Sequence, residues 1–182
     1  VYKKIPVAER LTDWGDRSLV VSDDVRKYLT EEYGIKPENI SVTVNGIDVD
    51  SFDSFSDEEE KRAGCISAGL TEELLPCADS FVGVSRAALE AMSCRIPTVL
   101  AGAQGFLGIF DDSEEMLRRA QSTNFCCRGE GASSADAICG ALISLFSLGG
   151  ELLSAIGENG RRVVEKYYSV SRMAGDAEEM YR

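Results

Sequence analysis

The 182-residue sequence contains no histidine. Histidine is the usual general base in enzymes, the usual partner of serine and cysteine nucleophiles, and the commonest metal ligand. Its absence therefore excludes Ser-His and Cys-His catalytic systems from this chain.

The sequence is also poor in positive charge. It has 19 Lys and Arg residues against 31 Asp and Glu residues, a net charge of −12. Such an acidic surface repels phosphate backbones and anionic lipids, so we expect no nucleic-acid partner and no general binding to membrane surfaces. A small anionic ligand is still compatible, because helix N-termini and one arginine can bind a diphosphate locally.

Long apolar runs and paired cysteine motifs are missing as well. No stretch approaches the ~20 apolar residues of a membrane span, and the N-terminus lacks the apolar core of a signal peptide. The six cysteines form no C-x-x-C pair, so a zinc site is not expected. We therefore expect a cytoplasmic, reduced protein with no metal and no cofactor. Because the sequence begins with Val1 rather than Met, we also expect a fragment of a longer protein.

What is present is an α/β pattern. An apolar share of 44% is enough for a folded core. A helix is predicted to start at Ser22, with the serine as its cap, and to end at Gly34. A turn is predicted at Asn45-Gly46. Further strands are expected at 18–21, 40–44, 80–84, 97–101 and 124–127, and further helices at 85–93, 112–120, 135–148, 152–168 and 170–181. This order predicts a Rossmann-like parallel sheet flanked by helices, with a helical C-terminus.

The segment 80–108 is the most informative for chemistry. It reads as strand, turn, helix, strand and a glycine-bearing loop at 102–108, so both connections lie at the carboxyl ends of predicted parallel strands, where α/β folds bind ligands. The helix N-terminus with Arg86 suits an anion, and Glu90, one turn further on, suits the hydroxyls of a ribose. The alternative is that Arg86 and Glu90 form a solvated i,i+4 ion pair.

Several segments carry motifs that follow one another in a recognisable order: residues 21–26, 40–48 with Phe52, 78–86 followed by Leu89-Glu90-Ala91-Met92, 97–106, and 159–169. Together they resemble family 4 glycosyltransferases. The resemblance implies a retaining sugar transferase of two Rossmann-like domains, truncated at the N-terminus and in the middle. Residues 1–50 would be the end of an acceptor-type domain with the interdomain linker, 51–77 a shortened linker region, and 78–182 the donor-binding domain with the C-terminal helices. The final helix is expected to pack against the residues before Asn45.

The resemblance also implies a substrate and site residues. The donor would be a nucleotide-diphosphate sugar and the acceptor a glycan or a lipid-linked glycan, with no metal needed. Carried over by position, Glu90 would hold the ribose hydroxyls, and Ser85 and Arg86 would lie beside the diphosphate. Gln104, Gly105 and Phe106 would border the sugar. Arg95 stands where the family usually has a glycine, from which we expect a strained left-handed residue.

Other interpretations stay open at this stage. The chain could be a non-catalytic module that binds a nucleotide sugar or a partner, or an inactive remnant. Cys126-Cys127 could be a redox pair, although burial is the more usual role of adjacent cysteines in an apolar run. The acids 111–115 could bind a cation or simply begin a helix. A half-sheet with open edges is also expected to pair with another copy as a homodimer.

Overall fold

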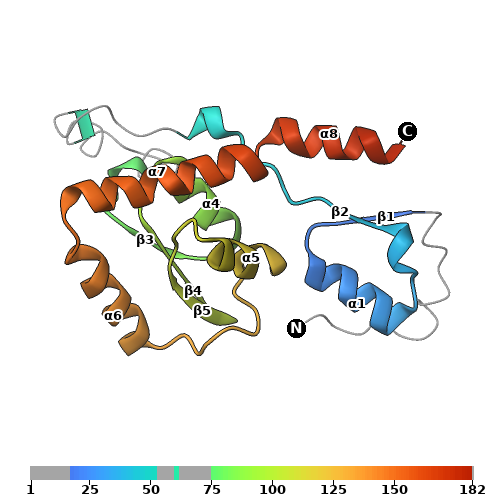
Figure 1. Cartoon of the computed structure of the whole chain (residues 1–182), viewed down its shortest axis with the longest axis horizontal. Coiled ribbons are helices and arrows are strands. Elements are labelled where there is room, and N and C mark those ends of the chain that lie inside the picture. Colours follow the sequence, from blue (N-terminus) through green and yellow to red (C-terminus); the bar gives the residue numbers. More distant parts are fainter. Residues whose placement is uncertain (1–16, 53–59, 62–74, 182) are drawn as a thin grey trace.

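The computed structural model describes residues 17–52, 60–61 and 75–181. Most of the predicted linker region therefore lies outside the described residues. The described chain forms two parts that lie side by side along the long axis of the molecule (Figure 1). The first part holds β1 (Ser18–Val20), α1 (Asp23–Tyr33), β2 (Ile40–Val42) and α8 (Val170–Tyr181). The second holds β3 (Phe81–Gly83), α4 (Ser85–Ser93), β4 (Thr98–Gly102), β5 (Gly105–Ile109), α5 (Glu114–Ser122), α6 (Ala135–Phe146) and α7 (Gly150–Tyr167).

The first part is built on two parallel strands joined through α1. Ser18 pairs with Ile40, and Val20 with Val42. The predicted end of α1 is confirmed, because Gly34 adopts a left-handed φ of 69° that a glycine accepts without strain. The predicted serine cap is wrong: Ser22 precedes α1, but its hydroxyl donates to the Asp24 carboxylate instead of accepting from a helix amide.

The second part contains a mixed three-stranded sheet in the order β3-β4-β5. β3 and β4 are parallel, with Phe81 opposite Thr98. β4 and β5 are antiparallel, and Gly102 faces Gly105 across a two-residue turn. The glycine-bearing segment after β4, expected to be a loop, is therefore a hairpin, because two residues are enough to reverse an antiparallel pair. The remaining helices and strands agree with the prediction to within a few residues, with one exception.

The exception is the strand expected at 124–127, which is wrong. These residues form turns, and Asn124, Phe125 and Cys127 all have positive φ. Phe125 and Cys127 are fully buried all the same. The apolar run thus marked a buried segment correctly, but its backbone bends too sharply for a strand.

The core of the second part lies between α4 and α7, where the helices approach closely at two glycines. A Cβ at Gly157 would lie 2.0 Å from the Arg95 carbonyl oxygen, and one at Gly160 would lie 3.3 Å from Met92. Arg95 itself has a φ of 58°, which confirms the expected left-handed residue after α4. The sequence therefore uses small residues on α7 so that its backbone can pack against the end of α4.

Helix α7 also holds the chain that leaves the first part. Arg161 is 8% exposed and donates to the carbonyl oxygens of Phe52 and Ser93, at 2.5 and 2.6 Å. Phe52 itself is 8% exposed and belongs to the core of the second part. The buried guanidinium thereby ties Phe52 to the end of α4.

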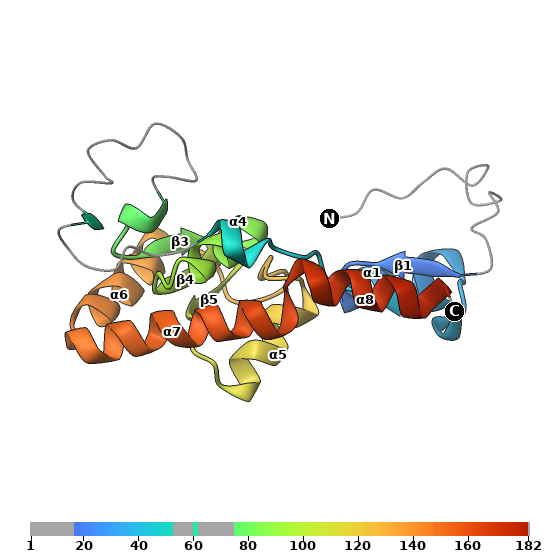
Figure 2. The same ribbon diagram turned by 90° about the horizontal axis from the view of Figure 1, so that it is seen from above.

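Helix α8 continues from α7 along the length of the molecule and returns to the first part (Figure 2). The Thr43 hydroxyl donates to Asp176 at 3.0 Å, and Arg172 donates to the Val44 carbonyl oxygen at 3.0 Å. Ile47 and Ser169 form an isolated parallel bridge at the junction. The expectation that the final helix packs against the residues before Asn45 is confirmed.

Among the described residues no single helix is long and apolar enough to cross a membrane. Helices α6 and α7 meet the length and composition criteria only as a pair, and that pair is bent by 115°.

Candidate ligand site at the strand ends

Three segments converge where β3 and β4 end. Ser85 follows β3 and donates its amide to the Phe125 carbonyl oxygen at 2.7 Å. A Cβ at Gly102, the last residue of β4, would lie 2.9 Å from the Val84 methyl groups. A Cβ at Gly105 would lie 1.9 Å from the Cys127 carbonyl oxygen. The 123–131 segment therefore packs directly against both strand ends, which is the edge where parallel sheets bind ligands.

Backbone strain concentrates at this convergence. Ser85, Asn124, Phe125 and Cys127 have positive φ values of 60°, 51°, 59° and 56°. Each such residue costs roughly 1–2 kcal/mol relative to right-handed backbone. Strained residues persist where the surrounding structure holds them, and they cluster at functional sites. The hydrogen bond from the Ser85 amide to the Phe125 carbonyl oxygen joins two of these residues. Each therefore helps to hold the other in its left-handed conformation.

Arg86 and Glu90 both lie on α4, at its first and second turns. The Arg86 guanidinium donates to Glu90 Oε1 at 2.7 Å, with the two side chains 67% and 22% exposed. The predicted i,i+4 ion pair between Arg86 and Glu90 is therefore confirmed. Arg86 and Ala87 are exposed in the first turn, whose amides lack partners within a helix. The binding roles of Ser85, Arg86 and Glu90 stay predictions.

The predicted sugar-binding residues divide into two groups. Gln104 lies at the hairpin turn, where its Oε1 accepts a hydrogen bond from Arg128 Nε at 3.0 Å. Gly105 lies against Cys127, as described above. The structure does not gather the Phe106 side chain with them: it packs against the cluster of Val99, Ala101 and Leu145. A role for Phe106 beside a sugar stays a prediction.

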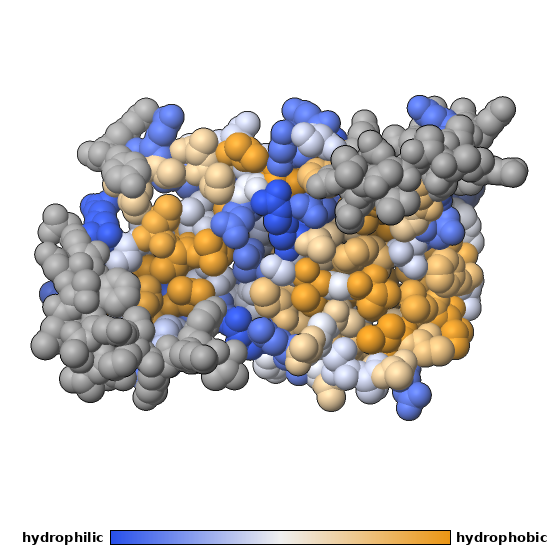
Figure 3. All heavy atoms as spheres, turned by 180° about the vertical axis from the view of Figure 1, so that it is seen from behind, coloured by the Kyte–Doolittle hydropathy of each residue, from blue (hydrophilic) through white to orange (hydrophobic). Residues whose placement is uncertain are grey.

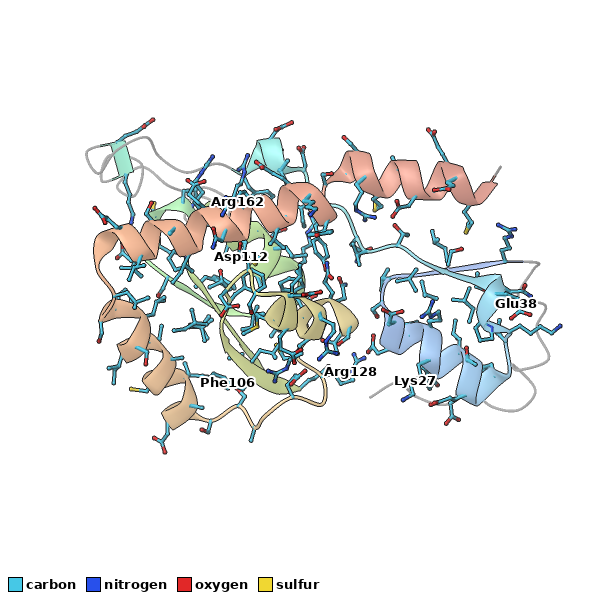
Figure 4. The ribbon with its side chains drawn as sticks, in the orientation of Figure 1. Lys27, Glu38, Phe106, Asp112, Arg128 and Arg162 are labelled. Atoms are coloured by element: carbon cyan, nitrogen blue, oxygen red, sulfur yellow. The ribbon has the colours of Figure 1, made fainter. Side chains whose placement is uncertain are left out.

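Arg128 is a site residue that the sequence interpretation missed. Besides Gln104, its guanidinium forms an ion pair with Asp24 at the start of α1. Figure 4 shows Arg128 on the side of the second part that faces α1. Arg128 therefore connects the hairpin of the second part to the first part, across the candidate site. One signal in the sequence points here: Arg128 is the only Lys or Arg between positions 120 and 160.

Buried polar atoms without partners lie four and five positions before Arg128 in the chain. Among the described residues, the buried Thr123 Oγ1 and Asn124 Oδ1 have no hydrogen-bond partner. An unsatisfied buried polar group costs about 1–3 kcal/mol, so such groups are retained for a reason such as an ordered water or a ligand.

The structure also bears on the redox-pair and cation-binding interpretations of the sequence. Burial raises the pKa of Cys127 to about 11, so its thiol stays protonated and unreactive at neutral pH, against the redox-pair interpretation. The acids at 111–115 begin α5, where Ser113 caps the helix by accepting from the Met116 amide. In the described part of the chain, no group of three or more Cys, Asp or Glu side chains is arranged to hold a metal ion.

Comparison with known proteins identifies the fold of the chain. The sequence matches no protein-family model and no curated protein. Among solved structures, the chain is similar to the crystal structure of a glycosyltransferase from Rickettsia africae ESF-5, with a TM-score of 0.71 and 14% identity. The match covers 99% of this chain and 68% of that one. The chain therefore has the α/β fold of a glycosyltransferase, while family 4 in particular and a shortened middle stay predictions.

Proposed function

We propose that the chain is a glycosyltransferase-like protein that binds a nucleotide-diphosphate sugar and transfers its sugar to a glycan or lipid-linked acceptor. One observation carries the proposal: Ser85, Gln104 and Gly105, expected in a donor site, all contact the 123–131 segment near the carboxyl ends of two parallel strands. The glycosyltransferase fold of the chain supports it.

The diphosphate would lie at the N-terminus of α4. The first-turn amides carry partial positive charge, and Arg86 adds a full charge beside them. The Arg86–Glu90 pair does not prevent this, because an exposed helical ion pair is worth only about 0.3–0.5 kcal/mol. The Arg86 guanidinium can therefore leave Glu90 and bind a diphosphate.

The ribose would lie at Glu90 and the sugar at the hairpin turn. A carboxylate has about four acceptor positions, so Glu90 can accept from two hydroxyls. Gln104 would face the sugar from the turn that Arg128 holds in place. In this arrangement Arg128 supplies a second positive charge on the side of the site that faces α1.

A second candidate function is a non-catalytic module that binds a nucleotide sugar with the same residues. The sequence favours this alternative in one respect, because it contains no histidine to act as a general base. Both functions share the donor site, so binding is tested first and turnover second.

The binding test is a thermal melt of the chain with UDP, GDP, ADP and their common sugar conjugates. A ligand at ~100 times its dissociation constant stabilises the fold by about 2.7 kcal/mol, a shift of a few degrees. We expect a shift with one nucleotide that Glu90→Ala abolishes. The matched control is Glu115→Ala, which breaks the comparable Glu115–Arg118 pair on α5 at 2.9 Å. An unshifted melt with every nucleotide, or equal losses in both variants, would contradict the proposal.

Turnover separates the two candidate functions. A transferase releases free nucleotide from the bound donor at a rate above the Glu90→Ala background. A chain that binds the donor and releases no nucleotide, with acceptor glycans added, would be a binding module.

A further inference from the structure

Helix α6 is apolar on both of its faces. Its inner face packs on the β4–β5 hairpin through Ile138, Ala141, Leu142 and Leu145. Its outer face carries Cys139, Ile143 and Phe146, all of which are exposed. A helix that is apolar all round is normally buried all round, yet this one is covered on one side only in the isolated chain.

The exposed apolar side chains of α6 lie on one stripe of the helix, and a further exposed apolar residue follows at the start of α7. Cys139, Ile143 and Phe146 follow each other at i, i+4 and i+7, so they lie on one stripe of the helix. Leu152, in the first turn of α7, follows directly after the connection. We call these four residues the α6 face. Hydrophobic residues also gather on this side of the molecule in the view from behind (Figure 3).

The large hydrophobic residues of the α6 face are more exposed to solvent than the other exposed hydrophobic residues of the described chain. Ile143, Leu152 and Phe146 are 63%, 57% and 54% exposed. The other large hydrophobic residues classed as exposed in the described chain are 37–43% exposed: Leu19, Val21, Val82 and Val170. Scattered exposed hydrophobics need no explanation, but a face that holds the three most exposed large hydrophobic residues of the described chain indicates an interaction surface.

The charge pattern indicates what covers it. No Lys or Arg occurs between residues 129 and 160, and the acids nearest the α6 face are Asp136 and Glu151. Helices that lie on membranes are rich in Lys and Arg on their polar side, which this region lacks. The chain as a whole has a net charge of −12, so two copies repel each other over most of their surface. The nearly uncharged α6 face is where a second copy can approach.

We propose that the α6 face is a homodimer interface in which the α6 helices of two copies pack against each other about a two-fold axis. The same residues then serve both copies, as in isologous interfaces. A 12-residue helix is about 18 Å long, so the contact falls short of the ~800 Å² per partner of a standard interface. The dimer is therefore weak and concentration-dependent. It uses a different surface from the sheet edges that the sequence suggested, and it does not depend on the proposed function.

The first test is sedimentation equilibrium of the chain over a wide concentration range, up to several hundred micromolar. We expect the average mass to rise from monomer towards dimer. Ile143→Asp should weaken association at least tenfold. Val170→Asp is the control, since it places the same charge on the most exposed of the other large hydrophobic side chains of the described residues, at the start of α8, and should leave association unchanged. Circular dichroism and a thermal melt verify that both variants fold.

Salt and crosslinking give independent readouts. Added NaCl screens the repulsion between two acidic copies, so the apolar dimer should tighten between 50 and 500 mM NaCl, the reverse of a charge-driven contact.

Cys139 has a free thiol and is exposed on the α6 face. A bis-maleimide with a spacer of about 15 Å should join two copies through it, given helix axes 8–10 Å apart. Cys139→Ser should remove this product, and Cys77→Ser should not.

Several outcomes would overturn the proposal. One is a monomeric mass at every concentration, and another is equal weakening by Ile143→Asp and Val170→Asp, which would place the contact elsewhere. A third is co-sedimentation of a monomeric chain with phosphatidylcholine vesicles, lost in Ile143→Asp, which would identify a lipid surface as the occupant of the α6 face.

Discussion

The two parts of the molecule are stabilised in different ways. In the second part, α4 alone buries five residues, and its packing against α7 brings the two helix backbones into near contact at Gly157. In the first part, α1 has no buried residue, and each strand is only three residues long. A two-stranded sheet of this size is marginal by itself.

What completes the first part is the C-terminal helix. Arg172, Met173 and Asp176 of α8 all bond to residues 43–46. The fit is incomplete, because an apolar cavity of about 260 Å³ lies between Leu19, Val20 and Met173. The comparison shows that close packing stabilises the second part, while the first part depends on a few polar contacts that span more than 120 residues of sequence.

The largest expected effect tests the close packing of the second part. In Gly157→Ala, the new Cβ meets the Arg95 carbonyl oxygen at 2.0 Å, so α7 must move away from α4. We expect a loss of about 3 kcal/mol in the free energy of unfolding, the upper range for overpacking, measured by urea denaturation.

The control for this variant lies in the first part. Gly175 is inside α8 with nothing within 4 Å of a Cβ, so Gly175→Ala should stabilise the chain by about 0.5–1 kcal/mol through its higher helix propensity. If both variants destabilised the chain equally, the contrast in packing between the two parts would be wrong.

A smaller effect concerns ionisation in the interior of the second part. Cys127 is fully buried, and burial raises its pKa from 9.0 to about 11. Below pH 9 both folded and unfolded chains keep the proton, so the stability is unaffected. Between pH 9 and 11 the unfolded thiol loses its proton and the folded one keeps it, so stability falls, by on the order of 2 kcal/mol at pH 11.

Burial also raises the pKa of Tyr168, which adds a loss of the same sign above pH 10. Urea denaturation at several pH values measures the slope. Cys127→Ala should flatten it between pH 9 and 10 and leave the part due to Tyr168. An unchanged slope in that variant would show that Cys127 is not the group that titrates.

The smallest effect tests the polar contacts of the first part. Arg172→Ala removes the hydrogen bond to the Val44 carbonyl oxygen and the ion pair with Asp176, for an expected loss of about 1 kcal/mol. Hydrogen exchange should then speed up in β1 and β2 but not in α4, because only the first part opens. Equal acceleration in both parts would mean that they unfold as one unit.

Many of the helices and strands of the two parts could be predicted from the sequence. Periodicity located α4 and α8 at the residues where they occur, and Gly34 marked the end of α1. The family resemblance, which has a glycine where this sequence has Arg95, indicated the left-handed conformation of that residue. The errors have a common cause. Whether the segments after β4 and α5 form a loop, a hairpin or a turn depends on close backbone contacts such as Gly105 with Cys127, which no local pattern reports.

The candidate site was predictable only in part for the same reason. Arg86 and Glu90 are four residues apart on one helix, so their pairing follows from local geometry. The links from Gln104 and Asp24 to Arg128 join segments 24 and 104 positions apart in the sequence. A single sequence carries no signal for contacts between such distant segments.

The return of α8 to the first part has a consequence for synthesis on the ribosome. β1 and β2 leave the ribosome well before α8, because Thr43 and its partner Asp176 are 133 positions apart in the sequence. Until α8 has been made, the two strands lack the contacts of that helix. Vectorial folding, which usually lets earlier segments fold first, therefore cannot complete the first part until the whole second part has been translated.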